Sequence, residues 1–223
     1  PSFSSDVAIR SFTSLVIAAP GLCSPSRKVV PKITKCSLPM KTQKYRQFIE
    51  NTIKKNKIPA VLSIVGNSGT GKTTLMEKLI PEFKSRGLKV GTIKHHIHDF
   101  EMDKPGKDSW RHKQAGSDVS MISSPGQIGI VMDAVYDHKP DELLHFFNNV
   151  DIVLTEGYKS GDNFKIEIIR SKRKDLPVKP LCTGDERLLA VISDFYIDTD
   201  VPRFSAEDIE GLAVFIINFF TLF

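Results

Sequence analysis

The residues with the clearest chemistry lie in one glycine-rich stretch, Gly66-Asn67-Ser68-Gly69-Thr70-Gly71-Lys72-Thr73. It fits G-x-x-x-x-G-K-[ST] at every fixed position, the pattern of a loop that binds nucleotide phosphates. Glycines let backbone N–H groups curl around phosphate oxygens, and the start of a helix adds a positive partial charge. Lys72 would then reach the β- and γ-phosphates, and the Thr73 hydroxyl would ligate Mg²⁺. The motif predicts a nucleoside triphosphate site.

The elements around this loop come in the order that such a site requires. Residues 60–65 predict a buried strand, 73–84 a helix with one apolar face, and 88–93 a second strand. Because two parallel strands need a crossover connection, this unit predicts a parallel sheet. We expect a three-layer α/β fold of the P-loop NTPase type, with a mostly parallel twisted sheet and helices on both faces. Its ligand should bind beyond the carboxyl ends of the strands.

Several acidic residues follow predicted strands, at the carboxyl ends where the ligand is expected to bind. The predicted strand 150–155 ends at Glu156, where the second Mg²⁺ carboxylate belongs. Asp108 could hold Mg²⁺ through water or orient the attacking water, or it could cap a helix together with Ser109. Asp194, after the predicted strand 188–192, could accept hydrogen bonds from guanine or cap a helix. No N-K-x-D signature is present, so the motifs leave the base open.

A long polar loop follows the second strand and begins with Lys94, His95 and His96, with His98 close behind. Three histidines within four residues could bind a transition metal, but no fourth ligand is evident. A loop that contacts nucleotide or a partner explains Lys94 and His95 equally well. Solvated surface is the third interpretation, and the sequence leaves all three open.

The other segments carry simpler signals. Strands are expected at 118–123 and 127–135, and a helix at 141–148. Residues 165–170 alternate between charged and apolar side chains, which predicts a half-exposed strand. The apolar helix expected at 206–220 suits a core or a dimer interface better than a membrane anchor.

Charge and composition exclude several classes of function. Residues 1–57 hold eleven Lys or Arg and two acidic residues, a net +9, which leaves 20 basic and 24 acidic residues and a net −4 for the remainder of the +5 chain. No aromatic-basic stripe accompanies the excess, so we expect no nucleic-acid binding. No apolar run is long enough to span a membrane. The three cysteines, Cys23, Cys36 and Cys182, form no C-x-x-C pair, which suits a reducing cytoplasm.

The chain divides into three parts. Residues 1–39 are Ser-rich with one acidic residue, and we expect them to be disordered or removable. A transit peptide, a short secretory signal and an extension upstream of a start at Met40 all remain open, and we favour the last. Residues 40–58 predict a basic lead-in helix, and 59–223 the nucleotide-binding domain.

Several ordered motifs together resemble one family. They are Gly66 to Thr74, Gly91-Thr92-Ile93-Lys94-His95-His96, the run from Asp103 to Ser109, Ala115-Gly116, and Thr155-Glu156-Gly157-Tyr158-Lys159. From about Pro59 to about Phe220 the chain is similar to the molybdopterin-guanine dinucleotide biosynthesis adaptor proteins, MobB. The resemblance implies a GTP-binding, usually homodimeric accessory protein that is at most a slow Mg²⁺-dependent GTPase. It would assist MobA, which joins GMP to molybdopterin.

The resemblance also distributes roles over the candidate residues. Gly66 to Thr74 would bind phosphates, with Lys72, Asp108 and Glu156 as the candidate catalytic residues. The Mg²⁺ region would include Thr73, Asp108 and Glu156, and Lys94 and His95 would contact nucleotide or the phosphate of the pterin. Two alternatives stay open: a small-molecule kinase whose acceptor is positioned by Lys94, His95 and Arg170, and a nucleotide-dependent metal-insertion protein that uses the three histidines.

Overall fold

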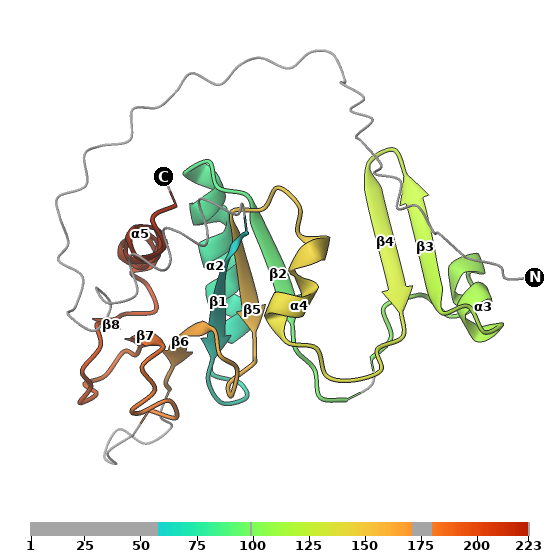
Figure 1. Ribbon diagram of the computed structural model, residues 1–223. Coiled ribbons are helices and arrows are strands. Elements are labelled where there is room, and N and C mark those ends of the chain that lie inside the picture. The colour runs from blue at the N-terminus through green and yellow to red at the C-terminus, as the bar shows by residue number, and fades with distance from the viewer. Residues whose placement is uncertain (1–57, 99, 171–179, 223) are drawn as a thin grey trace, which may run out of the picture. The chain divides into compact units, whose positions relative to one another are not determined.

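The computed structural model describes residues 58–98, 100–170 and 180–222, which belong to one compact unit (Figure 1). Its main sheet has six strands in the order β2-β5-β1-β6-β7-β8, and every pair of neighbours is parallel. The strands are β1 Ala60–Val65, β2 Val90–Lys94, β5 Ile152–Glu156, β6 Phe164–Ile168, β7 Leu188–Ile192 and β8 Arg203–Phe204. The predicted parallel α/β architecture is confirmed. The expected extension 1–39 and lead-in helix 40–58 lie outside the described residues, apart from Ile58.

Helices lie on both faces of this sheet. α2 (Lys72–Ser85) and α5 (Ile209–Phe220) share one apolar cluster with side chains from β1, β5, β6 and β7. On the opposite face, the Phe147 ring lies where a side chain at Gly91 of β2 would stand, so a residue larger than glycine would not fit there. Phe147 directly follows α4 (Pro140–Leu143) and the 3₁₀ helix η1 (Leu144–Phe146).

The two strands predicted in the middle of the chain form a sheet of their own. β3 (Val119–Ser124) and β4 (Gln127–Met132) pair antiparallel, and α3 (Asp108–Gln114) packs against β3. The Ser120 hydroxyl donates a hydrogen bond to the Ser109 carbonyl at 3.0 Å, which ties the strand to the helix. We call α3, β3 and β4 the hairpin module. It is inserted between β2 and α4 of the main fold.

The expectation of a half-exposed strand at 165–170 was wrong. β6 lies between β1 and β7, and the side chains of Lys165 and Glu167 are 2% and 1% exposed. Lys165 Nζ lies 2.6 Å from Asp185 Oδ2, and the Glu167 carboxylate accepts hydrogen bonds from the backbone N–H groups of Leu181 and Cys182. The charged residues at alternate positions of β6 are thus buried, and the ion pair of Lys165 and the hydrogen bonds of Glu167 offset their loss of water.

Several boundaries also differ from expectation. The helix expected at 141–148 is short and tightens into η1, and the C-terminal helix begins at Ile209, where the Asp208 carboxylate accepts a hydrogen bond from the Gly211 N–H. α2 runs through Pro81 without a break, although a proline inside a helix removes one backbone hydrogen bond. β8 was not predicted. Within the described ranges, the helices are all too short or too polar to cross a membrane.

Candidate nucleotide-binding site

The phosphate loop joins β1 to α2, and its glycines have positive φ angles. Gly66, Gly69 and Gly71 have φ of 147°, 75° and 96°, a region that other residues rarely adopt. A Cβ at Gly66 would lie 2.6 Å from the Ile168 carbonyl oxygen, because the loop passes close to the end of β6. The glycines are therefore required both by the backbone path and by the lack of space.

The side chain of Lys72 folds back onto this loop. Its Nζ donates hydrogen bonds to the carbonyl oxygens of Asn67 at 2.8 Å and Gly66 at 3.2 Å. The Thr70 hydroxyl donates to the same Asn67 carbonyl at 2.9 Å. An ammonium held at the mouth of a glycine loop and a helix N-terminus together suit a phosphate group.

Glu156 is the residue on which the neighbouring strand ends converge. The strand register sets Ile64 of β1 and Lys94 of β2 opposite it. Its Oε2 accepts a hydrogen bond from Thr73 Oγ1 at 3.0 Å, and its Oε1 lies 3.4 Å from Lys94 Nζ. The Glu156 side chain is 14% exposed, against 65% for that of Lys94. A hydroxyl and a carboxylate side by side are ligands that suit Mg²⁺, so Thr73 and Glu156 fit the metal that the phosphate loop implies.

Arg170 also reaches the loop, although the sequence suggested it only as a contact for a kinase acceptor. It follows β6, and its Cζ would lie 3.6 Å from a Cβ built on Gly71. A small cavity beside them is lined by Thr70, Gly71, Thr74, Leu75, Lys78, Ile168, Arg170, Ile192 and Ala206. Asp194 Oδ1 lies 3.3 Å from the Ala206 nitrogen, so Asp194 is adjacent to this cavity. The available signal for Arg170 was its position after a strand end.

Asp108 is not brought to this cluster. It stands in the first turn of α3 with a side chain 90% exposed, 3.9 Å from Arg111 Nη1. The contacts of the described residues do not join it to Thr73 or Glu156. α3 is preceded by Lys107 as its N-terminal cap residue and has no side-chain capping bond. The capping interpretation of Asp108 and Ser109 therefore finds no support, and the Mg²⁺ role of Asp108 stays a prediction.

The histidines of the polar loop point to different partners. His95 Nε2 lies 2.9 Å from Asp137 Oδ1, and its ring stacks on Tyr158 with centroids 4.3 Å apart. The rings of His96 and His98 meet edge to face at 5.7 Å. Among the residues that the structure describes, no group of three or more His, Cys, Asp or Glu could hold a metal ion. The described contacts thus do not favour the metal-binding interpretation.

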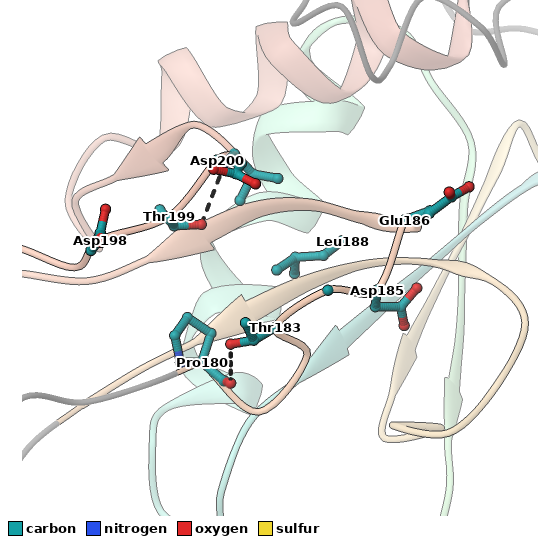
Figure 2. A pocket seen from close by; sticks show the side chains of 10 residues that line it. Pro180, Thr183, Asp185, Glu186, Leu188, Asp198, Thr199 and Asp200 are labelled. Carbon is teal, nitrogen blue, oxygen red and sulfur yellow. Dashed lines mark hydrogen bonds between the residues drawn. The ribbon is translucent and has the colours of Figure 1, made fainter.

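A second, larger cavity contains none of these groups (Figure 2). Its volume is about 360 Å³, and the acidic residues around it are Asp185, Glu186, Asp198 and Asp200. Carboxylates repel phosphate, so the glycine loop is the better candidate for a nucleotide despite its smaller cavity.

Comparison with known proteins matches this arrangement to one family. The family model described as "Molybdopterin guanine dinucleotide synthesis protein B" (MobB) covers residues 61–194, more than half of the chain. The chain belongs to the MobB family. The molybdopterin-guanine dinucleotide biosynthesis adapter protein of Haemophilus influenzae is 39% identical over 165 residues, 73% of this chain and 90% of that protein. The adapter protein of Escherichia coli is 35% identical over 170 residues, 74% and 94% of the two chains.

Solved MobB structures agree with the fold. A crystal structure of molybdopterin-guanine biosynthesis protein B has a TM-score of 0.55 at 28% identity and covers 72% of this chain and 99% of that one. Bacillus subtilis MobB has a TM-score of 0.57 at 26% identity, with coverage of 72% and 97%. The region that matches the MobB family model runs from β1 to Asp194, so it contains the phosphate loop, the hairpin module and Glu156.

Proposed function

We propose that this protein is a GTP-binding adapter that assists the attachment of GMP to molybdopterin, forming molybdopterin-guanine dinucleotide. One observation carries the nucleotide part: the Thr73 hydroxyl at the phosphate loop lies 3.0 Å from the Glu156 carboxylate at the end of the neighbouring strand. The pathway rests on the family, whose relatives are described as adapter proteins of molybdopterin-guanine dinucleotide biosynthesis.

The roles of the site residues follow from their chemistry. The backbone from Gly66 to Thr74 would surround the phosphates, and Lys72 would exchange its carbonyl acceptors for phosphate oxygens. Mg²⁺ would be held by Thr73 and Glu156, both of which carry oxygen ligands. Arg170 adds a second positive charge beside Gly71. The metal neutralises phosphate charge when bound.

Other residues would serve recognition. Asp194, beside the cavity next to the loop, would accept hydrogen bonds from the guanine ring. Lys94 lies close enough to Glu156 to balance its charge and to contact either the nucleotide or the phosphate of the pterin. His95 would stand next to the same ligand, and Asp108 would act through water if the polar loop closes over the site.

A homodimer is supported by one face of the hairpin module. The cross-strand register places Val119, Met121, Ile128 and Met132 on the same face of β3 and β4. These side chains are 50%, 57%, 63% and 50% exposed, while α3 packs on the module through Ser120 of the other face. A two-stranded sheet with an open apolar face is only marginally stable. A second copy of the chain, presenting the same face, would cover it.

The adapter would act on its partner more than on its nucleotide. We infer slow GTP hydrolysis and function with MobA and molybdopterin, without nucleic-acid or membrane binding. Cys182 is a buried free thiol, which fits a reducing compartment, so we assign the protein to the cytoplasm.

Calorimetric titration with GTP, ATP and GDP in the presence of Mg²⁺ tests this proposal on the full chain. We expect GTP to bind more tightly than ATP, with slow turnover. Lys72→Ala should lose nucleotide binding, while Lys84→Ala, an exposed lysine near the end of α2, should leave it unchanged. Equal affinity of Lys72→Ala and the wild type would refute the site. Preference for ATP with rapid turnover would indicate a kinase.

A further inference from the structure

The loop after β5, Gly157 to Asn163, begins at the nucleotide site, and its first residue is tightly constrained. Gly157 directly follows Glu156, and its N–H donates a hydrogen bond to the Ile64 carbonyl at 3.1 Å. The N–H of His95 donates to the Glu156 carbonyl at 2.9 Å. Gly157 has a φ of 112°, and a Cβ there would lie 3.0 Å from the His95 Cβ. The backbone at Glu156 and Gly157 is therefore held against both β1 and His95.

Tyr158, the residue after Gly157, contacts residues 133–139, the segment that leads from β4 of the hairpin module back to α4. Tyr158 donates its hydroxyl to the His138 carbonyl at 3.0 Å, and its ring stacks on His95, which in turn contacts Asp137. Burial and the charge of Asp137 raise the pKa of Tyr158, so the hydroxyl stays protonated as a donor. Tyr158 has a φ of 55°, an uncommon backbone angle for a residue other than glycine. These contacts hold it there.

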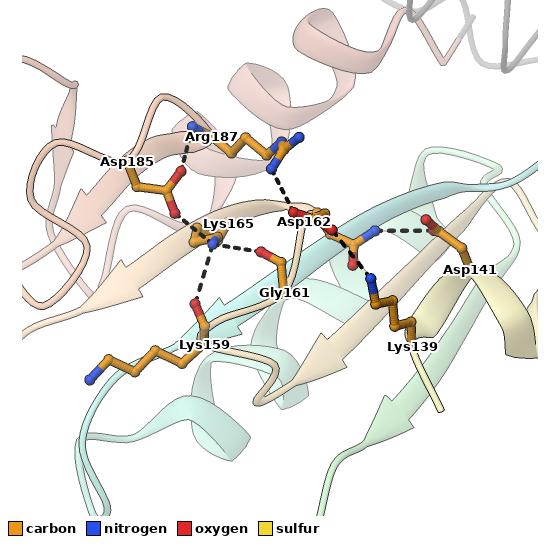
Figure 3. A network of polar contacts seen from close by, with 9 residues as sticks. Lys139, Asp141, Lys159, Gly161, Asp162, Lys165, Asp185 and Arg187 are labelled. Atoms are coloured by element: carbon orange, nitrogen blue, oxygen red, sulfur yellow. Dashed lines mark hydrogen bonds and ion pairs between the residues drawn. The ribbon is translucent and has the colours of Figure 1, made fainter. Parts of the chain in front are cut away.

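The rest of the loop is fixed on two sides (Figure 3). Asp162 lies 3.5 Å from Lys139 Nζ, and Asn163 donates a hydrogen bond to Asp141 at 3.1 Å, so both contact the start of α4. Underneath, the buried Lys165 ammonium donates to the carbonyls of Lys159 and Gly161. Because its turns are bonded to one ammonium, the loop should move as a body.

We propose that this loop couples nucleotide binding at the phosphate loop to the hairpin module, with Tyr158 as the positioning residue. The proposal rests on the proposed nucleotide binding. When nucleotide and metal bind, Glu156 exchanges its contacts with Thr73 and Lys94 for new ones. The change reaches Asp137 and His138 through Gly157 and Tyr158, and from there β4. The described contacts run from Glu156 to Asp137 and His138, and residues 133–136 join these two to β4 along the chain.

The chain supplies its own reporter, because its single tryptophan, Trp110, lies in α3 of the hairpin module. We would titrate Mg²⁺-GTP into the full chain by calorimetry and by Trp110 fluorescence in parallel. Hydrogen exchange of the β3 and β4 amides is a second readout. The wild type should change its emission or exchange on binding. Tyr158→Phe keeps the ring and removes only the bond to His138, so it should lose part of the change, and Tyr158→Leu should lose most of it.

The nucleotide affinity of the variants separates the proposed coupling from the proposed nucleotide binding on which it rests. Both variants should bind nucleotide within about twofold of the wild type, since the described side-chain contacts of Tyr158 go to His138 and His95 and not to the phosphate loop or Glu156. Tyr196→Phe, a tyrosine 81% exposed, is the matched control and should behave as the wild type. The coupling is overturned if the wild type binds without either change, or if Tyr158→Leu gives the full response. Absence of binding in calorimetry overturns the proposed function as well.

Discussion

Replacing Lys165 by Met should strongly destabilise the fold. The Lys165 side chain is 2% exposed and its ammonium makes three contacts: 2.6 Å to Asp185, 2.9 Å to the Gly161 carbonyl and 3.2 Å to the Lys159 carbonyl. Because Met fills a similar volume, the variant loses the ion pair and hydrogen bonds of the ammonium but keeps the packing. Removing one partner of a buried ion pair costs roughly 3–5 kcal/mol. Asp185 is 32% exposed and can regain water, so we expect the lower end, about 3 kcal/mol.

Urea unfolding followed by far-ultraviolet circular dichroism measures this loss. With a slope of roughly 2 kcal/mol per molar urea, 3 kcal/mol lowers the midpoint by about 1.5 M. Lys139→Met is the matched control, because its ion pair with Asp162 is 3.5 Å long and its side chain is 70% exposed. Exposed pairs contribute roughly 0–1 kcal/mol. If both variants unfold at the wild-type midpoint, the buried ammonium does not hold the loop and the reasoning fails.

Three further predictions concern single carboxylates and a thiol. Glu156→Gln should weaken GTP binding about tenfold in the presence of Mg²⁺, which is about 1.4 kcal/mol. When a chelator removes Mg²⁺, the variant and the wild type should bind GTP equally well. An equal loss of affinity with and without Mg²⁺ would exclude a metal role for Glu156. For Asp185, burial raises the pKa, but hydrogen bonds from Lys165 and the Arg187 amide bring it below the ordinary 3.8. The ionised Asp185 therefore stabilises the fold fully above pH 3.8, and this stabilisation is lost as the pH falls through the lower folded pKa. The loss of unfolding free energy caused by Asp185→Asn should accordingly shrink in acid. If urea unfolding at a series of pH values gives the same loss throughout, the prediction is contradicted. Burial, followed by the charge of Glu167, raises the pKa of Cys182 to about 11, so native protein should resist iodoacetamide at pH 8 at this thiol and react after unfolding, as read by peptide mass spectrometry.

Local patterns were sufficient where the chemistry is contiguous in the chain. The phosphate loop, the strand before it and the helix after it lie within residues 60–85. Each is specified by the spacing of residues that are close together in the sequence. Glu156 followed from one rule, that ligands bind at the carboxyl ends of parallel strands. The structure adds the partner, since the register of β5 beside β1 brings this carboxylate to Thr73.

Patterns failed where a side chain depends on a distant partner. The alternation in β6 is the same for a solvated face as for a face of buried charges, and only the carboxylate of Asp185 and the N–H groups of Leu181 and Cys182 separate the two cases. The strand signals of the hairpin module were correct, but a period of two residues does not say which strand is the neighbour. Asp108 lies on α3 of that module, and its predicted Mg²⁺ role stays a prediction.

By itself, the sequence determined that this chain is a parallel α/β protein with a phosphate loop, because glycine spacing and apolar periodicity act over a few residues. Only the tertiary structure decided that Lys165 and Glu167 are buried, and that Tyr158 joins the strand carrying Glu156 to the segment returning from the hairpin module. The partners that decide these positions lie 14 to 20 residues away in the chain, and the stability of the contacts comes from burial and hydrogen-bond partners that no local pattern contains.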